Sequence, residues 1–347
     1  MKRKKILLSV LGVALLLGAL AAYFGLNYYN TLFKSNVKVN GDAYYLYVPT
    51  GASLKTLQDS LRSAKAIIDE DCLLRAVELT DFEQPKPGRY KLTSGMSNRT
   101  LLRMLKTGNQ SPVRLTLSGN IRTNDKLASI VSRYIEPDST QLLSYFNNND
   151  NLEEYGVNAS TLLGICILNT YEFYWNTTPE EFVARMYKEC DRFWNEEREN
   201  KRKQTPWSRL EVMTIASIVA EETVKTDEMP RVAGVYINRL KKGWKLEADP
   251  TLKYAVSDFT IRRVLNKHKE VDSPYNTYKY EGLPPGPICI PSTAAIDAVL
   301  NAEQHDYMFF CAKADFSGYH AFAKTLTQHN RNAAEYQKAL NKMNIYR

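Results

Sequence analysis

Two adjacent glutamates, Glu221 and Glu222, stand at the end of an apolar stretch and are well placed for acid–base chemistry. The segment before them, "LEVMTIASIVA", carries only one other charged residue, Glu211. A carboxyl group in apolar surroundings has a raised pKa, because desolvation disfavours the charged form. A carboxylic acid that keeps its proton near neutral pH can act as a general acid.

The helix that would carry these glutamates has a clear start. Ser208 and Glu211 form an S-x-x-E capping box, which predicts that a helix begins there. At helical spacing the apolar residues fill one broad arc, and Glu222 falls inside it. Glu221 falls with Ser217 on the opposite, polar side, so we expect Glu221 to be solvated and Glu222 to be the candidate acid. The alternative is that the helix frays and Glu222 turns to solvent.

The sequence after Glu222 predicts the elements that would surround its carboxyl group. A second helix is expected from near Pro230 to Gly243, followed by a turn at Asp249–Pro250. The Pro/Gly-dense loop 282–291 is too rigid and too apolar for a linker, and we expect it to form the wall of a groove. Beside it lie side chains that can stack on a ligand or hydrogen-bond to it: Tyr275, Asn276, Thr277 and Tyr278.

Composition and charge narrow the function classes. The 347 residues are enough for two domains with a sizeable core. The formal net charge is +8, and residues 2–5 contribute four of these charges. No basic stripe with interleaved aromatic residues follows, so we expect no nucleic acid as a partner. The five cysteines and four histidines show no metal-ligand spacing, and we expect no disulfide framework, no metal and no cofactor.

An uncharged apolar run at residues 6–25 matches the hydrocarbon thickness of a bilayer. A secretory signal is the alternative, but its apolar region is usually shorter and ends in a small-x-small cleavage site. Ala19–Leu20–Ala21 fits such a site weakly, and the apolar run continues past it. We therefore expect a cytoplasmic tail at residues 1–5 and a single transmembrane helix at residues 6–27. Because positive residues stay on the cytoplasmic side, residues 28–347 should lie on the extracytoplasmic side.

The rest of the chain predicts an α+β fold in two parts. Residues 28–42 have the polar composition of a tether. Residues 43–110 predict a small unit of two helices on a short sheet, with Ser53 and Ser97 as helix N-caps. Residues 111–347 form a larger α+β domain, which contains the candidate acid.

Several motifs in fixed order resemble one known family. The order "ASIVxxET", "VAGVYINRLKKG", "SPYNTY", "GLPPGPI" and "H.F..T...HN" is similar to that of the endolytic murein transglycosylases, the YceG-like family. The resemblance extends from about Ala43 to the end of the chain. It implies a small lysin-motif-like module at residues 43–110 and an α+β catalytic domain at residues 111–347.

The resemblance also implies an activity and a location. Members of the family cut the glycan strands of peptidoglycan internally, at the bond between N-acetylmuramic acid and N-acetylglucosamine. They leave 1,6-anhydro-N-acetylmuramic acid ends and thereby terminate nascent strands. The implied partners are peptidoglycan strands, the lipid bilayer of the inner membrane and the peptidoglycan synthases of that membrane.

The catalytic residue follows from a matching motif position, and the substrate-binding residues are expected from their placement in the sequence. The last glutamate of the family's "ASIVEKET" matches Glu222, the residue that the helical pattern also selects, while Ala220 stands where many members have a glutamate. Further departures are Leu168–Asn169 and Ile290. The residues expected to position the sugar and its stem peptide are Asn238, Arg239, Asp249, Tyr275, Asn276, Thr277 and Tyr278.

Two other functions fit the same residues. A non-catalytic, membrane-anchored scaffold that binds peptidoglycan would survive the loss of Glu222. A lysozyme-type hydrolase would need a second acid near Glu222, and Glu221, Glu247 or Asp249 are candidates. The reducing end of the product separates the two enzymes, because a transglycosylase leaves an anhydro end and a hydrolase a free one.

Overall fold

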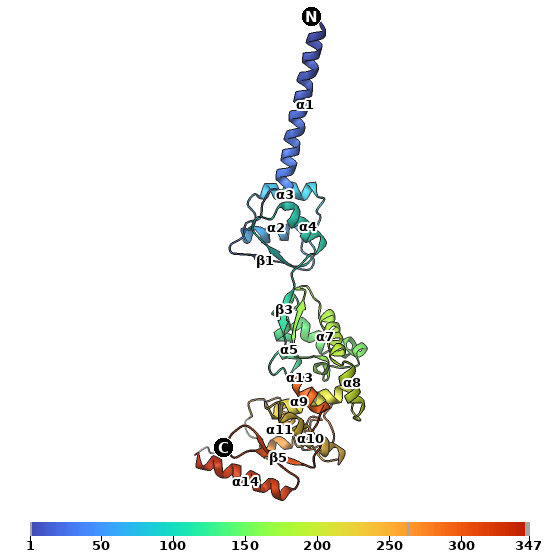
Figure 1. Cartoon of the computed structure of the whole chain (residues 1–347), viewed down its shortest axis with the longest axis vertical. Coiled ribbons are helices and arrows are strands. Elements are labelled where there is room, and N and C mark those ends of the chain that lie inside the picture. Colours follow the sequence, from blue (N-terminus) through green and yellow to red (C-terminus); the bar gives the residue numbers. More distant parts are fainter. Residues whose placement is uncertain (1, 262–263, 344–347) are drawn as a thin grey trace. The chain divides into compact units, whose positions relative to one another are not determined.

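The computed structural model describes residues 2–261 and 264–343 and has a mixed α and β fold. The chain forms two compact units (Figure 1). The first contains Met1–Arg114 with Glu172–Thr177, and the second contains Leu115–Tyr171 with Thr178–Arg347. The chain leaves the first unit within β3 (Val113–Thr116), returns to it within β4 (Thr170–Phe173) and enters the second unit again after Thr177.

The first unit begins with the long helix α1 (Lys2–Leu32), drawn in blue in Figure 1. Its segment Ile6–Leu32 is long enough and apolar enough to cross a membrane. The leucine side chains of this segment before Leu32 are largely exposed; Leu7, for example, is 70% exposed. Apolar surface of this extent is unfavourable in water and favourable in a bilayer, so the helix is consistent with a single-pass anchor.

The expectation of a polar tether at residues 28–42 is wrong. Helix α1 continues to Leu32, and both Leu32 and Val37 are buried in the core of the first unit. Asn36 is also buried. Its Nδ2 donates to Oδ1 of Asn98 at 2.9 Å, and this hydrogen bond satisfies the amide inside the protein. A polar composition therefore did not mean exposure in this segment.

A two-stranded antiparallel sheet and three helices complete the first unit. Leu46 of one strand faces Tyr90 of the other, and both are buried. Ser53 and Ser97 cap their helices as predicted, and the second of these helices ends at Gly108, whose φ of 73° suits glycine. A third helix, capped by Asp69, was not expected. The elements are β1 (Tyr44–Val48), α2 (Leu54–Ser63), α3 (Glu70–Leu79), β2 (Gly88–Leu92) and α4 (Asn98–Thr107).

The second unit is mainly helical and contains one antiparallel hairpin, β5 (Phe309–Ala312) with β6 (His320–Ala323). Helix α9 (Arg209–Glu222) packs against α10 (Met229–Lys241), α11 (Asp249–Ala255) and α13 (Thr293–Leu300). The remaining helices are α5 (Asn124–Val131), α6 (Ser139–Phe146), η1 (Asn149–Asn151), η2 (Glu153–Tyr155), η3 (Leu162–Ile165), α7 (Pro179–Phe193), α8 (Glu196–Lys203), α12 (Asn266–Lys269) and α14 (Leu326–Lys342).

Helix α9 is buried on all sides along most of its length. The capping box of Ser208 and Glu211 is present as predicted. The expected polar side does not face solvent, because Thr214 and Ser217 are buried. Their hydroxyl groups donate to helix carbonyl groups, Thr214 to Leu210 at 2.8 Å and Ser217 to Thr214 at 2.7 Å. Short hydroxyl side chains can meet their hydrogen-bonding needs within the helix in this way. The helical spacing of polar residues therefore overstated the solvent exposure of this side.

The Pro/Gly-dense loop 282–291 covers this side of α9 rather than forming the wall of a groove. The backbone N–H of Ile288 donates to Oγ of Ser217 at 3.0 Å, and the backbone N–H of Ile290 donates to the carbonyl of Ile121 at 2.9 Å. Ile288, Cys289 and Ile290 are buried. The rigidity of the loop therefore serves the core that holds α9.

Candidate active site

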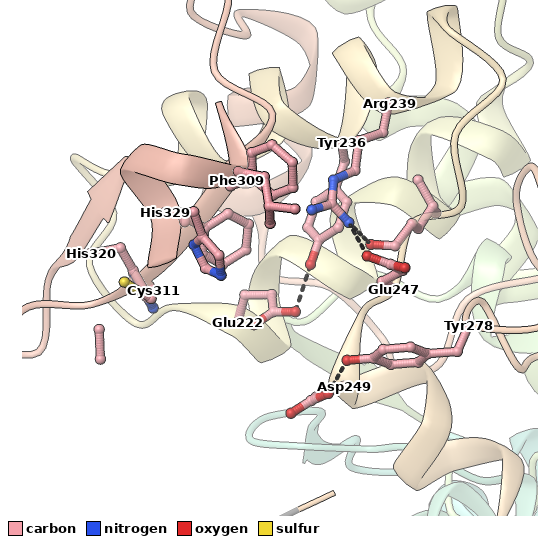
Figure 2. A pocket seen from close by; sticks show the side chains of 14 residues that line it. Glu222, Tyr236, Arg239, Glu247, Asp249, Tyr278, Phe309, Cys311, His320 and His329 are labelled. Carbon is pink, nitrogen blue, oxygen red and sulfur yellow. Dashed lines mark hydrogen bonds and ion pairs between the residues drawn. The ribbon is translucent and has the colours of Figure 1, made fainter. Parts of the chain in front are cut away.

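A pocket of about 390 Å³ lies at the C-terminal end of α9 (Figure 2). Helices α9, α10, α11 and α14, the β5–β6 hairpin and two connecting loops contribute to its wall. The lining residues are Glu222, Tyr236, Arg239, Leu246, Glu247, Asp249, Tyr278, Phe309, Phe310, Cys311, Ala312, His320, Leu326 and His329.

Glu222 is the last residue of α9 and lies in this pocket. Burial raises the pKa of its carboxyl group from 4.5 to about 7. The hydrogen bond from Tyr236 opposes this shift, and the negative charge of Asp249 adds to it. Lys253 and Arg239 lower the pKa by smaller amounts. Glu222 therefore retains a proton at pH values where an ordinary glutamate is ionised, as predicted from its place in the apolar arc.

Tyr236 on α10 fixes one oxygen of this carboxyl group. Its hydroxyl donates to Oε1 of Glu222 at 2.6 Å (Figure 2). The tyrosine is only 2% exposed, and its ring stands edge-on to Phe310 with centroids 5.9 Å apart. Burial and the neighbouring Glu222 raise the pKa of Tyr236, so it stays a donor. Oε1 accepts this bond, whereas Oε2 of Glu222 makes no hydrogen bond within residues 2–261 and 264–343 and is the oxygen expected to meet a ligand.

Two further bonded groups line the pocket beside Glu222. Arg239 is held by backbone carbonyl groups, because its Nε donates to Met308 at 2.8 Å and its Nη1 to Leu246 at 2.7 Å. Its Nη1 also lies 3.5 Å from the carboxylate of Glu247. Opposite, the hydroxyl of Tyr278 donates to Oδ1 of Asp249 at 2.5 Å. Burial raises the pKa of Tyr278 and keeps this hydroxyl protonated.

The structure brings three of the predicted substrate-binding residues to the pocket, namely Arg239, Asp249 and Tyr278. Asn238 is not among the lining residues. Its Nδ2 donates to the backbone carbonyl groups of His305 at 2.7 Å and Tyr307 at 3.0 Å. This amide therefore joins α10 to the segment before β5.

Tyr275, Asn276 and Thr277 are buried and also do not line the pocket. Nδ2 of Asn276 donates to the backbone carbonyl groups of Lys269 and Val271, and its Oδ1 accepts from the backbone N–H of Tyr278. The Thr277 hydroxyl accepts from the backbone N–H of Ala248 at 3.0 Å and shares a hydrogen bond of 2.7 Å with Thr251. The hydroxyl of Tyr275 donates to the carbonyl of Ser160 at 3.3 Å. These side chains brace the loop that carries Tyr278.

The expectation that Glu221 is solvated is wrong. Its two oxygens accept from Nε and Nη2 of Arg122, at 2.9 and 2.7 Å, in a two-point ion pair. The glutamate side chain is only 13% exposed. No pattern in the sequence indicated this pair, because Arg122 lies far from Glu221 along the chain.

Three further residues line the pocket that were not expected from the sequence to be site residues: Tyr236, His320 and His329. Tyr236 could have been found from its position in the apolar helix segment "VAGVYINR", because a buried tyrosine hydroxyl requires a partner. The two histidines belong to the motif "H.F..T...HN", which pointed to the family rather than to a role.

The structure thus combines an N-terminal helix long and apolar enough to span a membrane with a pocket that holds the carboxyl group of Glu222. A protein-family model, the YceG-like family, matches residues 46–335, and the chain belongs to this family. This finding agrees with the resemblance that the motifs indicated.

The names of similar proteins agree with this family. A protein from Bacillus subtilis (strain 168) named endolytic murein transglycosylase is 28% identical over 323 residues, covering 89% of this chain and 87% of the relative. A protein of the same name from Streptococcus pneumoniae (strain D39) is 26% identical over 369 aligned positions, covering 96% of this chain but only 65% of the relative. The crystal structure of a yceG-like protein from Listeria monocytogenes aligns with a TM-score of 0.56 at 25% identity, covering 84% of this chain and 99% of that protein.

Proposed function

We propose that this chain is an endolytic murein transglycosylase. It would cut peptidoglycan strands between N-acetylmuramic acid and N-acetylglucosamine and leave 1,6-anhydro-N-acetylmuramic acid ends. The observation that carries the proposal is the position of Glu222 in a pocket, where burial raises the pKa of its carboxyl group to about 7. The names of the relatives from Bacillus subtilis and Streptococcus pneumoniae support the same reaction class.

In the proposed reaction, Glu222 donates its proton to the glycosidic oxygen that leaves C1 of N-acetylmuramic acid. Oε2 is the donor, because Oε1 accepts the hydrogen bond from Tyr236. The C6 hydroxyl of the same sugar attacks C1 and closes the 1,6-anhydro ring. The Glu222 carboxylate formed in the first step can help to remove the proton of that hydroxyl.

A second free carboxylate is not needed in this scheme, because no water molecule has to be activated. The two other acids of the pocket have partners within the protein. Asp249 accepts from Tyr278, and Glu247 lies beside Arg239. This pairing favours a transglycosylase over a lysozyme-type hydrolase.

We assign the direct substrate contacts to Arg239, Asp249 and Tyr278, which line the pocket with Glu222. Asn238 and the segment 275–277 act indirectly in this proposal. They hold the elements from which Arg239 and Tyr278 project.

The remaining parts of the chain receive roles in the same proposal. Residues 43–110 form a lysin-motif-like module that holds a glycan strand, and residues 111–347 form the catalytic domain. Helix α1 crosses the inner membrane with its basic end in the cytoplasm, which places both parts on the extracytoplasmic side. Cleavage at this position would terminate nascent strands beside the peptidoglycan synthases.

The test uses the full chain in detergent, purified peptidoglycan and mass analysis of the released fragments. Wild type and Glu221→Gln should release fragments with 1,6-anhydro ends, and Glu222→Gln should release none. Glu221 is the matched control, because it is the adjacent glutamate on α9 and is occupied by Arg122. Free reducing ends would favour the hydrolase. Binding of glycan without any cleavage by wild type would favour the scaffold and contradict the proposal.

A further inference from the structure

A second acid–base pair lies at the pocket and has no role in the scheme above. His320 opens strand β6, lines the pocket and has a side chain that is 15% exposed. Glu228 precedes α10 and is only 4% exposed. Oε2 of Glu228 lies 2.7 Å from Nδ1 of His320, and Oε1 accepts from the backbone N–H of the same histidine at 2.8 Å. A buried carboxylate thus contacts this histidine through both of its oxygens.

The contact at Nδ1 selects one tautomer of the neutral imidazole. A carboxylate only accepts hydrogen bonds, so Nδ1 must carry the hydrogen that lies between them. Nε2, on the other side of the ring, then carries a lone pair. No hydrogen bond to Nε2 occurs within residues 2–261 and 264–343. The ring of Phe310 stands edge-on to the imidazole at 5.2 Å and helps to fix its plane. His320 lines the pocket, and its contact with Glu228 makes Nε2 the acceptor atom of the neutral ring.

The pair is also attached to the end of the helix that carries Glu222. The hydroxyl of Thr223 donates to Oε2 of Glu228 at 3.4 Å, and Thr223 is the residue directly after Glu222. The chain thus places a proton donor and a proton acceptor on the same pocket from adjoining elements (Figure 2).

We propose that His320, oriented by Glu228, is a second acid–base residue of this site and takes the proton of the hydroxyl that attacks C1. This inference rests on the proposed transglycosylase reaction and refines it. Glu222 must hold a proton at the start, so it becomes a base only after the leaving group has taken that proton. In the neutral tautomer that Glu228 selects, His320 can accept a proton before the leaving group departs.

The step balances without any other reactant. The proton of the C6 hydroxyl moves to Nε2 of His320 as the bond between O6 and C1 forms. The bond between C1 and the leaving oxygen breaks, and that oxygen receives the proton of Glu222. The imidazolium, stabilised by Glu228, then releases its proton to solvent, and Glu222 takes one up. The enzyme returns to its starting state with no net change in protons.

Several other groups that can be charged share the pocket with His320 and belong in any account of its pH dependence. They are Glu222 on α9, Arg239 on α10, Glu247, Asp249 on α11, the thiol of Cys311 on the neighbouring strand and His329 on α14. Glu228, outside this list, contacts the imidazole directly through a hydrogen bond and ion pair.

The experiment compares turnover of purified peptidoglycan by the full chain in detergent across pH, for wild type and three variants. His320→Gln should lower kcat by about 100-fold or more, with a smaller change in KM. Its residual activity should lack the fall toward low pH that protonation of the base causes in wild type. Asp227→Asn is the matched control, because it removes the adjacent carboxylate, which accepts from Tyr319 and does not line the pocket. It should leave kcat within about threefold of wild type.

Glu228→Gln tests the orientation itself. The backbone N–H of His320 still needs an acceptor, so the amide oxygen should face it and the amide NH₂ should face Nδ1. Nδ1 then has to accept, the hydrogen moves to Nε2, and the base is lost although His320 is present. A loss of kcat similar to that of His320→Gln is therefore expected. The same reversal of tautomer costs about 10⁴-fold in the serine protease triad.

A second readout does not depend on activity. In full-length protein labelled with ¹⁵N-histidine, NMR at pH 8 should show the hydrogen of His320 on Nδ1 in wild type and on Nε2 in Glu228→Gln, with His320→Gln used for assignment. An Nε2–H tautomer in wild type would overturn the inference. So would anhydro products from His320→Gln at an undiminished rate or with the pH profile of wild type. A wild type that forms no anhydro products would instead refute the proposed reaction, and the inference with it.

Discussion

The hydroxyl of Tyr236 donates a hydrogen bond of 2.6 Å to Oε1 of Glu222, across the junction of α9 and α10. This bond has two effects on the acid. It holds the carboxyl group in one orientation, and it lowers the pKa of Glu222, which burial raises. The value of about 7 is the outcome of these opposed effects, so each of them can be tested by removing one neighbour.

Tyr236→Phe removes the hydrogen bond and leaves the burial in place. The pKa of Glu222 should then rise above that of wild type, and the fall of activity at high pH should move to higher pH. Loss of the fixed orientation should lower kcat by about tenfold, which corresponds to one hydrogen bond of about 1.4 kcal/mol. The measurement is the pH dependence of kcat. An unchanged high-pH limb would show that the bond does not act on the acid.

Asp249→Asn should move the same limb in the opposite direction. The negative charge of Asp249 raises the pKa of Glu222, and an asparagine can still accept from Tyr278 through its oxygen. The pKa of Glu222 should therefore fall, and activity should be lost at lower pH than in wild type. The products should keep their anhydro ends. If Asp249 instead activated water in a hydrolase, the variant would lose activity at every pH.

The sequence predicted the helix that carries Glu222 because the information lies within that one helix. The capping box of Ser208 sets the start of α9, and the apolar arc places Glu222 on the buried side. Local hydrogen bonds and side-chain periodicity determine both features, and both can be read over a short window. The caps at Ser53 and Ser97 were predictable for the same reason.

Two other contacts at the end of α9 and beside the pocket were not predictable, because they join distant positions. Arg122 reaches Glu221 from 99 residues away, and Glu228 and His320 are 92 residues apart. No periodic pattern connects such residues. The segment 275–277 shows the converse error: polar side chains beside a loop looked like ligand contacts, but they satisfy buried backbone groups.

The Arg122–Glu221 pair should affect stability rather than catalysis. Glu221→Gln leaves the guanidinium, which is 25% exposed, without its charged partner. We expect a loss of about 1–2 kcal/mol in the free energy of unfolding and a kcat close to that of wild type. Urea unfolding and turnover of peptidoglycan measure the two quantities. The double variant with Arg122→Gln should lose less stability than the two single variants together. A loss of kcat as large as that of Glu222→Gln would contradict this assignment.

Glu222→Gln should make the protein more stable at high pH, even though it abolishes the proposed activity. In the unfolded chain Glu222 ionises near pH 4.5, whereas in the folded protein it keeps its proton up to about pH 7. The folded state thus binds more protons between these values, so this group reduces the stability of wild type as the pH rises through that range. The reduction is at most about 3 kcal/mol, at 1.36 kcal/mol per pKa unit. Glutamine has no proton to lose, and its oxygen can still accept from Tyr236.

Thermal unfolding at pH 5 and pH 8 measures this effect as a difference between two proteins. The melting temperature of Glu222→Gln minus that of wild type should be larger at pH 8 than at pH 5. Glu221→Gln is the control, and it should be less stable than wild type at both pH values because it breaks an ion pair. The same difference for Glu222→Gln at both pH values would mean that the carboxyl group ionises as easily in the folded protein as in the unfolded chain. In that case Glu222 would not hold the proton that the proposed reaction requires.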